Sequence, residues 1–478
     1  MIYLRKCTNI HIEIICTDNQ TLRKIKAHFS YPVITYKDKK RKIVNVCLLY
    51  RDRYLPFGLI NDMIEFLDDN NIHFNVDHEI FETNTVDIDK LYKSFDYYKL
   101  PHIPTEYQKK TVYLCMRDKR KIVLSPTSSG KSLIIFLTCM SYLIMKEPNK
   151  KIIIVVPSIT LVNQMYYDFK DYTKNSSIDI SDYVQRKGGG NKEEFTKNIL
   201  ITTWQSLMNE KYTFLNQFGM LLFDEVHTGK APVTKDIVEK INAPYRIGFT
   251  GTLTNEDDEL SGKTIQGLFG DVHVATNYAE LLDLEFITPL EIRSIILNHT
   301  GVDYKLTWHE EREFITTSNP RFLFVTNLIK KCKGNSLVLF KTIDHGKKLA
   351  HELEKTKTVF YIDGGIKGQM REDIRQEMER DDNCVLVASY KTTATGFSVK
   401  NIHNVIFAES MKARISVIQA IGRGLRKHNT KDIVLIYDIC DSILYDNFMI
   451  SYSEKHYQSR KRYYNEYDYP FREVEVNI

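Results

Sequence analysis

Long apolar runs recur through most of the chain, with stretches of helical spacing between them. In the middle of the sequence the runs are Ile152–Val156, Asn198–Ile201, Met220–Phe223 and Arg246–Phe249. A second series consists of Ser336–Lys341, Val359–Ile362, Val385–Ala388, Val405–Ala408 and Ile433–Tyr437. Runs without polar alternation are typical of strands buried on both faces, and strands that alternate with helices form parallel sheets covered on both sides. The pattern predicts an α/β protein with two parallel-sheet lobes.

The first hundred residues have shorter and more polar segments. Strands are predicted at residues 10–16, 33–37, 43–50 and 72–76, and helices at residues 18–28, where Asp18 can cap the first turn, and 58–67. The order strand, helix, strand, strand, helix, strand predicts a small α+β domain built as a split βαβ unit. Residues 81–100 show no clear periodicity and are predicted to be a linker. The predicted domains are therefore an accessory domain, residues 1–95, and two lobes, residues 96–287 and 288–478.

Composition narrows the class of protein without identifying it. A length of 478 residues, with 43% hydrophobic and 27% charged residues, is ordinary for a globular protein of about three domains. The net charge of +5 is too small to indicate a polyanionic partner by itself. The eight cysteines include no Cys-x-x-Cys pair, which argues against a zinc site and a disulfide framework. Without a membrane-spanning run or a signal peptide, we expect a soluble, cytoplasmic monomer.

A polar loop between two apolar segments carries the first candidate chemistry. It follows the run 122–124, and its residues are Ser125, Pro126, Thr127, Ser128, Ser129, Gly130, Lys131 and Ser132. A strand, a tight loop and a helix in this order can aim backbone N–H groups at a polyphosphate such as that of ATP. Lys131 would reach the β and γ phosphates, and Ser132 would hold Mg²⁺. Ser125 stands where this motif usually has glycine, and an ordinary surface turn is the alternative.

Charged residues downstream of the loop could complete a site for phosphoryl transfer. Asp224 and Glu225 end the apolar run 220–223, and ligands bind at the carboxyl ends of strands in open α/β sheets. Asp224 is suited to hold Mg²⁺ and Glu225 to deprotonate an attacking water, although acidic turns after strands are common.

In the second lobe, Arg423 and Arg426 are three residues apart on a predicted helix, so they would share a face and could act as arginine fingers. An exposed basic stripe is the alternative. Since this lobe has no phosphate loop of its own, nucleotide is expected in the cleft between the lobes.

These segments, in this order, resemble motifs I, II, III and VI of the superfamily 2 helicases. The matching residues are Ser125–Ser132, Asp224–His227, Thr250-Gly251-Thr252 and Gln419 through Arg426. The resemblance implies two RecA-like lobes with a single nucleic-acid strand across their top, and Gln419 among the catalytic residues. It implies that Thr250, Gly251 and Thr252 couple hydrolysis to movement. By the same resemblance, adenine or phosphate contacts are expected from Tyr107, Gln108 and Gly396.

Further residues would hold the nucleic-acid backbone by the same resemblance, without reading its bases. They are Pro157, Gln164, Thr202, Thr203, Lys341 and Thr392. A narrower resemblance, over nearly the whole chain, is to a bacteriophage helicase of recombination and fork repair. It includes the segment 187–190, and it adds Gly188 and Gly189 to the expected DNA contacts.

Two basic segments lie outside these motifs. Lys39, Lys40, Arg41 and Lys42 form the tip of a predicted hairpin. A solvated turn is the simpler interpretation, and a clamp on the DNA backbone is the functional one. Near the carboxyl end, Lys455–Tyr464 mixes cations and aromatic residues. Base stacking on Tyr463 or Tyr464 is one interpretation, but a helix that packs its aromatic side chains on the second lobe is the expected one.

Three functions fit the sequence. The first is an ATP- and Mg²⁺-dependent DNA helicase or translocase that binds single-stranded and branched DNA, including forks, recombination junctions and RNA–DNA hybrids. The second is an RNA-directed or transcript-releasing helicase of the same superfamily, which nothing in the motifs excludes. The third is a protein that binds DNA junctions and in which nucleotide binding only sets the conformation, without hydrolysis. Glu225, Arg423 and Arg426 argue against the third, because a pure binding protein has no need of them.

Overall fold

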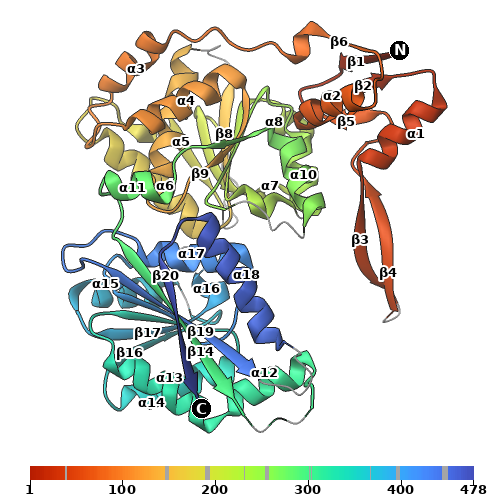
Figure 1. Ribbon diagram of the computed structural model, residues 1–478. Coiled ribbons are helices and arrows are strands. Elements are labelled where there is room, and N and C mark those ends of the chain that lie inside the picture. The colour runs from red at the N-terminus through yellow and green to blue at the C-terminus, as the bar shows by residue number, and fades with distance from the viewer. Residues whose placement is uncertain are drawn as a thin grey trace. The chain divides into compact units, whose positions relative to one another are not determined.

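The computed structural model (Figure 1) describes residues 1–37, 40–145, 150–188, 194–230, 232–252, 258–300, 302, 304–366, 368–393, 399–443 and 450–478. The chain folds into two compact units, residues 1–125 with 130–275 and residues 126–129 with 276–478. None of the helices within the described ranges is long and apolar enough to cross a membrane.

The first unit contains a seven-stranded, all-parallel sheet. Its order is β13-β7-β12-β11-β8-β10-β9. The strands are β7 Arg120–Leu124, β8 Lys151–Val156, β9 Val184–Lys187, β10 Ile199–Thr203, β11 Phe218–Asp224, β12 Tyr245–Thr250 and β13 Val272–Val274. The helices are α4 Glu106–Asp118, α5 Lys131–Met145, α6 Ile159–Thr173, α7 Trp204–Leu207, α8 Tyr212–Leu215, α9 Pro232–Lys240 and α10 Glu259–Phe269. The apolar runs thus form the predicted buried strands, and the short edge strands β9 and β13 were missed.

The polar residue in the run 246–249 has a structural reason. Arg246 is fully buried in β12, and its guanidinium donates hydrogen bonds to three backbone carbonyls, those of Leu268 at 2.9 Å, Ile241 at 2.6 Å and Val238 at 3.0 Å. A buried cation is tolerated only when its donors are satisfied. Arg246 therefore ties the sheet to the segments that flank β12.

The amino-terminal residues form a smaller sheet of order β5-β2-β1-β6. Its strands are β1 Ile2–Lys6, β2 His11–Ile15, β5 Tyr54–Pro56 and β6 Phe74–Val76, and its helices are α1 Asn19–His28 and α2 Ile60–Asp69. The carboxylate of Asp18 caps α1 as predicted, because it accepts hydrogen bonds from the backbone N–H groups of Gln20 and Thr21.

The prediction of a split βαβ unit is wrong in one respect. Within the described residues, the two middle strands, β3 Ser30–Lys37 and β4 Lys40–Cys47, pair with each other alone and form a separate hairpin, which extends away from the small sheet in Figure 1. Ile34 and Ile43 face each other in its register and are 49% and 62% exposed. The alternating pattern identified the strands correctly, but it could not show that the small sheet is completed by β1 and β5 instead.

The segment predicted as a linker contains a helix, α3 Ile88–Asp96. Asp87 caps it, and its face carries the buried residues Leu91 and Phe95, followed by buried Tyr98. The Tyr98 ring meets Phe136 of α5 edge to face, with centroids 5.5 Å apart. Spacings of four and three residues are helical, so the periodicity was present but too short to recognise.

The small amino-terminal sheet docks on the larger one through α10 and the turn that begins α2. Lys263 of α10 pairs with Asp62, and Asn61 donates a hydrogen bond to Asp271 at 2.6 Å. The Arg120 guanidinium lies 4.3 Å from the centroid of the Phe57 ring. A Cβ atom added at Gly58 would overlap the carbonyl oxygen of Gln266. Glycine therefore permits this close backbone approach.

The second unit contains another seven-stranded, all-parallel sheet, of order β16-β17-β15-β18-β19-β14-β20. Its strands are β14 Leu290–His299, β15 Ser336–Phe340, β16 Thr358–Ile362, β17 Cys384–Ser389, β18 Asn404–Phe407, β19 Val434–Ile443 and β20 Phe471–Asn477. Its helices are α11 Tyr278–Asp283, α12 Trp308–Thr317, α13 Asn319–Lys331, α14 Ile343–Glu354, α15 Gly368–Arg380, α16 Tyr390–Thr393, α17 Arg414–Gly424 and α18 Tyr452–Glu466. The two-lobed parallel α/β fold is confirmed. Strand β14 was missed because polar residues interrupt it.

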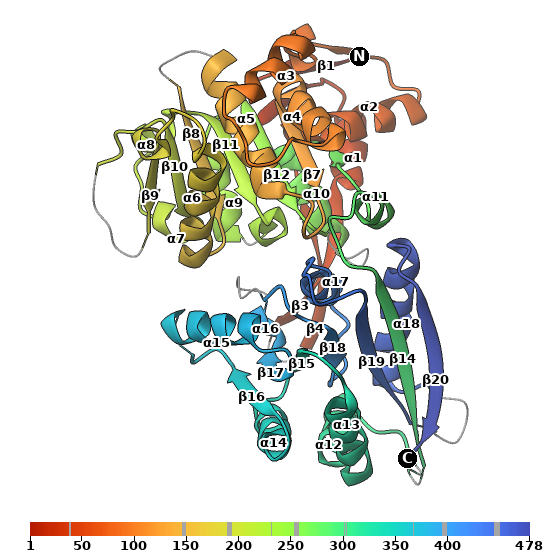
Figure 2. The ribbon, with the colours of Figure 1, turned by 90° about the vertical axis from the view of Figure 1, so that its left-hand side faces the viewer.

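The aromatic tail forms helix α18, which runs beside β19, β14 and β20 (Figure 2). Tyr463 and Tyr464 are buried, and Arg460 pairs with Asp438 at 2.8 Å, with both side chains fully buried. The interpretation that packs the aromatic residues on the second lobe is confirmed, and stacking of bases on Tyr463 or Tyr464 is wrong because neither ring is accessible.

Replacing Gly58 with alanine tests the docking of the amino-terminal sheet. We expect Gly58→Ala to destabilise the first unit by about 1–3 kcal/mol, the usual cost of overpacking a tight contact. The thermal unfolding midpoint measures this, and Gly364→Ala, where a Cβ would meet nothing within 4 Å, is the matched control. Equal midpoints for the two variants would contradict the docking described.

Candidate active site

The polar loop after β7 lies at the carboxyl edge of the first sheet. Leu124 of β7 pairs with Thr250 of β12, and the N–H of Ser125 donates to the Thr250 carbonyl at 2.8 Å. Two residues of the loop, Ser128 and Gly130, have positive φ angles of 69° and 76°. The predicted order of strand, loop and helix is confirmed, since α5 begins at Lys131.

Lys131 is the centre of a cluster of charges. Its ammonium lies 2.9 Å from Asp224 Oδ1 and 2.8 Å from Glu225 Oε1, although Glu225 is 94 residues away in sequence. Burial opposes the charge of this ammonium, but the two carboxylates raise the pKa of Lys131 above its usual value. Glu225 has a positive φ of 53°, and its N–H donates to Asp224 Oδ1 at 3.0 Å. The sharp turn after β11 thus directs both carboxylates to one cation.

This cluster continues into the carboxyl end of β12. His227 Nδ1 lies 3.0 Å from Thr250 Oγ1 and 3.3 Å from Glu225 Oε2. The Thr250 hydroxyl donates to the Thr252 carbonyl at 2.7 Å and accepts from the Thr252 N–H at 3.3 Å. Thr250 and Thr252 are therefore linked to the carboxylates through His227. No role was predicted for His227, although its position directly after Asp224, Glu225 and Val226 was a signal that could have found it.

Gln108 contacts the loop from α4. It forms a capping box with Thr105, in which Thr105 N–H donates to Gln108 Oε1 at 3.0 Å. The amide nitrogen of Gln108 lies so close to Gly130 that a Cβ atom there would collide with it. Tyr107 is buried beside it, with its hydroxyl 3.5 Å from the Gln108 amide nitrogen. The expected adenine-reading residues are thus held against the loop by a helix cap.

The residues at this edge suit a nucleoside triphosphate with a divalent cation. The buried Asp224 carboxylate already accepts a cationic partner, the Lys131 ammonium. The hydroxyl of half-buried Ser132, in the first turn of α5, adds an oxygen of the type that Mg²⁺ prefers. The N-terminus of α5 and the positive-φ loop supply N–H donors for phosphate oxygens.

The candidate arginines lie in the second unit, and one prediction about them is wrong. Gln419 and Arg423 are half-buried on α17, but this helix ends at Gly424, so Arg426 does not share a helical face with Arg423. The Lys431 ammonium donates to the carbonyl of Gly424 at 2.7 Å, and Arg426 instead forms a β-bridge with Ile287. Burial lowers the pKa of Lys431 to about 7.

The expected nucleic-acid contacts differ in accessibility. Gln164, Lys341, Arg41 and Lys42 are exposed, and Pro157 and Gly188 are half-buried. Thr202, Thr203 and Thr392 are buried, with the Thr203 hydroxyl capping α7 and the Thr392 hydroxyl 2.7 Å from Ser389 Oγ. Lys39, Gly189 and Gly396 lie outside the described residues, as does the Lys40 side chain.

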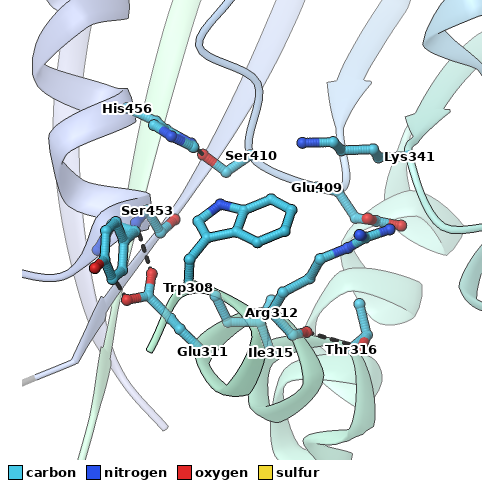
Figure 3. Close-up of a pocket in the computed structure, with 11 residues that line it drawn as sticks. Trp308, Glu311, Arg312, Ile315, Thr316, Lys341, Glu409, Ser410, Ser453 and His456 are labelled. Carbon is cyan, nitrogen blue, oxygen red and sulfur yellow. Dashed lines mark hydrogen bonds between the residues drawn. The ribbon is translucent and has the colours of Figure 1, made fainter. Parts of the chain in front are cut away.

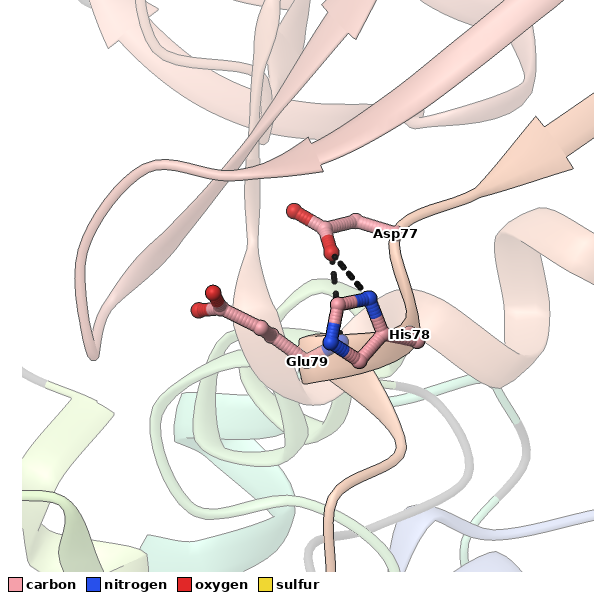
Figure 4. A group of neighbouring side chains, drawn as sticks. All are labelled: Asp77, His78 and Glu79. Atoms are coloured by element: carbon pink, nitrogen blue, oxygen red, sulfur yellow. Dashed lines mark hydrogen bonds and ion pairs between the residues drawn. The ribbon is translucent and has the colours of Figure 1, made fainter.

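A second group of potential metal ligands, Asp77, His78 and Glu79, lies directly after β6 (Figure 4). Asp77 Oδ1 accepts the N–H of Glu79 at 3.2 Å and lies 3.5 Å from His78 Nδ1, while His78 and Glu79 are exposed. This is the geometry of a helix cap, and we assign it no further role.

A lysine held between two carboxylates, behind a phosphate-type loop at the carboxyl edge of a parallel sheet, defines a P-loop nucleoside triphosphatase. The family models for "Type III restriction enzyme, res subunit" and "Helicase conserved C-terminal domain" match residues 87–255 and 320–428. The chain belongs to the superfamily 2 DNA helicases, which are ATP-driven enzymes.

One relative matches almost the full length of the chain. The ATP-dependent DNA helicase UvsW of enterobacteria phage T4 is 31% identical over 90% of this chain and 89% of its own length. The crystal structure of T4 UvsW covers 100% of this chain with a TM-score of 0.50 and 26% identity. The DNA 3'-5' translocase XPB2 of Sulfurisphaera tokodaii is 23% identical over 69% of this chain and 80% of its own. The resemblance to the phage helicase is confirmed.

Replacing Gly130 tests the conformation of the loop. An alanine there must adopt a positive φ and displace the Gln108 amide. We expect Gly130→Ala to weaken ATP binding about fivefold or more, because a strained residue costs about 1–3 kcal/mol. Titration with a fluorescent ATP analogue measures this, with Gly364→Ala as control. Unchanged affinity would show that nucleotide does not bind against this loop.

Proposed function

We propose that this protein is an ATP- and Mg²⁺-dependent DNA helicase that acts on branched DNA, such as replication forks and recombination junctions, in recombination and repair. The observation that carries the proposal is the ion pair of Lys131 with Asp224 and Glu225. The match to UvsW over nearly the whole chain supports the choice of DNA over RNA.

We assign each residue of the ion-pair cluster one task. Lys131 moves from the carboxylates to the β and γ phosphates when nucleotide binds, and Ser132 and Asp224 would hold the Mg²⁺. Bound Mg²⁺ would supply positive charge to the phosphate oxygens. Glu225, whose strained turn directs it into the same space, orients the attacking water and accepts its proton.

Further residues support this reaction. Tyr107 and Gln108 contact the base. Gln419, Arg423 and Arg426 stabilise the negative charge that develops on the transferred phosphoryl group. The chain of hydrogen bonds from His227 through Thr250 to Thr252 connects Glu225 to the end of β12, so a change at the γ-phosphate can reach this part of the sheet.

DNA is proposed to contact all three predicted domains, and the exposed Lys341 is the proposed backbone contact of the second lobe. Pro157, Gln164 and Gly188 present the amino end of α6 and the end of β9 to the strand backbone. The buried hydroxyls of Thr202, Thr203 and Thr392 are assigned to shaping the loops around them, since they are already engaged within the protein. Residues 1–95 serve as an accessory domain that meets duplex DNA through the β3–β4 hairpin.

Replacing Glu225 separates catalysis from binding. Glu225→Gln keeps the shape of the side chain and removes the base, so we expect DNA-stimulated ATP hydrolysis to fall by about 10²-fold or more, as for loss of a general base. Binding of forked DNA should stay within about twofold. Glu194→Gln, an exposed glutamate of the same unit, is the matched control. Hydrolysis at the wild-type rate would reject the role of Glu225.

The same assay identifies the nucleic acid. Single-stranded DNA, RNA, forked duplex, a four-way junction and an RNA–DNA hybrid are compared as activators of the wild-type protein. The proposal expects DNA to stimulate hydrolysis and the branched substrates to be unwound. Stimulation by RNA alone would favour the RNA-directed alternative.

Replacing the hairpin tip tests the accessory domain. We expect alanine at Lys39, Lys40, Arg41 and Lys42 to weaken duplex binding and to lower the salt slope by about 1 for each phosphate that the tip no longer neutralises. Basal ATP hydrolysis should be unchanged. Arginine at the three lysine positions keeps the charge and should restore the slope. An unchanged salt slope in the alanine variant would show that the tip does not contact DNA phosphates and is a solvated turn.

A further inference from the structure

A pocket in the second unit contains a cluster of side chains that the ATPase site does not use (Figure 3). It lies at the carboxyl ends of β15 and β18, between the first turns of α12 and α18. Among its lining residues are Trp308, Arg312, Lys341, Ser410 and His456. The carboxyl edge of a parallel sheet is where ligands of open α/β folds bind. We call this cavity the Trp308 pocket.

The pocket combines an aromatic ring with cations. The ring of Trp308 is half-buried, and the Lys341 ammonium and the Arg312 guanidinium lie 5.2 Å and 5.6 Å from its centroid. Burial and the nearby cations Arg460 and Lys341 lower the pKa of His456 to about 4, so it is neutral at pH 7. Lys341 and Arg312 therefore provide the positive charge beside the ring.

Two carboxylates also line the pocket, but both are engaged in holding the structure. Glu311 is 2% exposed and accepts the backbone N–H groups of Tyr452 and Ser453 at 2.8 and 2.6 Å. Glu409 is 4% exposed and accepts from the Thr342 hydroxyl at 2.9 Å and from His345 at 2.8 Å. The acids fix the start of α18 and of α14, and they leave the exposed charge of the pocket positive.

The backbone that carries the ring is fixed by the capped start of its helix. Trp308 is the first residue of α12 and lies between Thr307 and Glu310, which form a capping box. The Arg312 guanidinium, one turn later, donates to the Thr342 hydroxyl at 2.8 Å. A tryptophan that presents part of its ring beside cations is an arrangement that can stack a nucleobase and pair with its phosphate.

We propose that the Trp308 pocket binds one nucleotide of a single DNA strand, with the base stacked on Trp308 and the adjoining phosphate paired with Lys341 and Arg312. The inference rests on the proposed function only in that the protein must bind DNA. The expected motif residues contact only the nucleic-acid backbone. The Trp308 pocket would add a contact to a base. Lys341 would leave its place over the ring to reach the phosphate, which frees the ring for the base.

A strand without bases separates stacking from phosphate contacts. The full-length protein with Trp204→Phe keeps Trp308 as its one tryptophan, because the chain contains two. We expect an oligothymidylate strand to quench its fluorescence, and an abasic strand of the same length to quench it little. The abasic strand should bind at least fivefold more weakly, the lower end of about 1–3 kcal/mol per stacked base.

Single substitutions in the wild-type protein test whether Trp308 stacks the base and whether Lys341 contacts the phosphate. Trp308→Ala should remove the preference for the oligothymidylate strand, and Trp308→Phe should keep most of it. Lys341→Ala should lower the salt slope by about 1 for both strands, and Lys355→Ala, a lysine beyond the end of α14 and before β16, should leave it unchanged.

Two outcomes overturn the proposal in different ways. Equal quenching and equal affinity for the two strands, in a protein that binds DNA and hydrolyses ATP on it, would reject the Trp308 pocket and leave the proposed function intact. A protein that binds neither strand would reject the pocket together with the function. The quenching assay retains Trp308, and Trp308→Phe retains an aromatic ring at position 308. A folding defect caused by Trp308→Ala therefore cannot explain the results of these two experiments.

Discussion

The active site depends on one constraint, that parallel strands bring their carboxyl ends to the same edge of a sheet. Strands β7, β12 and β11 are neighbours, so the loop before Lys131 and the turn that carries Asp224 and Glu225 meet although they are far apart in sequence. The Lys131 ammonium satisfies both carboxylates at 2.9 and 2.8 Å. Three charges that would be costly to bury alone thus stabilise one another. When nucleotide and a cation bind, Lys131 can pair with a phosphate and the carboxylates with the cation, in place of their pairing with one another.

The second unit also contains buried ion pairs, but these hold helices on the sheet. Arg321 of α13 pairs with Asp441 at 2.6 Å, and Arg460 of α18 pairs with Asp438 at 2.8 Å, with all four side chains fully buried. Both acids lie on β19, so this strand anchors a helix through each pair. Removing one partner of such a pair leaves an uncompensated charge, which costs about 3–5 kcal/mol. The buried pairs therefore fix α13 and α18 on the sheet.

The sequence predicted the parts of the fold that have long, uniform patterns. The apolar runs became central parallel strands, and the loop at 125–132 and the acids at 224 and 225 meet as expected from their positions at strand ends. Strand β14 was not predicted because it mixes apolar and charged residues. Helix α3 was not predicted because its apolar face covers too few turns. Local patterns also did not show that β3 and β4 form a separate hairpin, or that α17 ends at Gly424, whose carbonyl accepts a hydrogen bond from Lys431.

The most direct test of the ion-pair cluster is the dependence of ATP affinity on Mg²⁺. Isothermal titration compares ATP binding with Mg²⁺ and with EDTA, in the wild-type protein and in Asp224→Asn. If Asp224 holds the cation, Mg²⁺ should tighten ATP binding in the wild type by about tenfold or more, since one charge-assisted interaction contributes about 1.5–3 kcal/mol. Most of this gain should disappear in Asp224→Asn. An equal gain in both proteins would contradict the account.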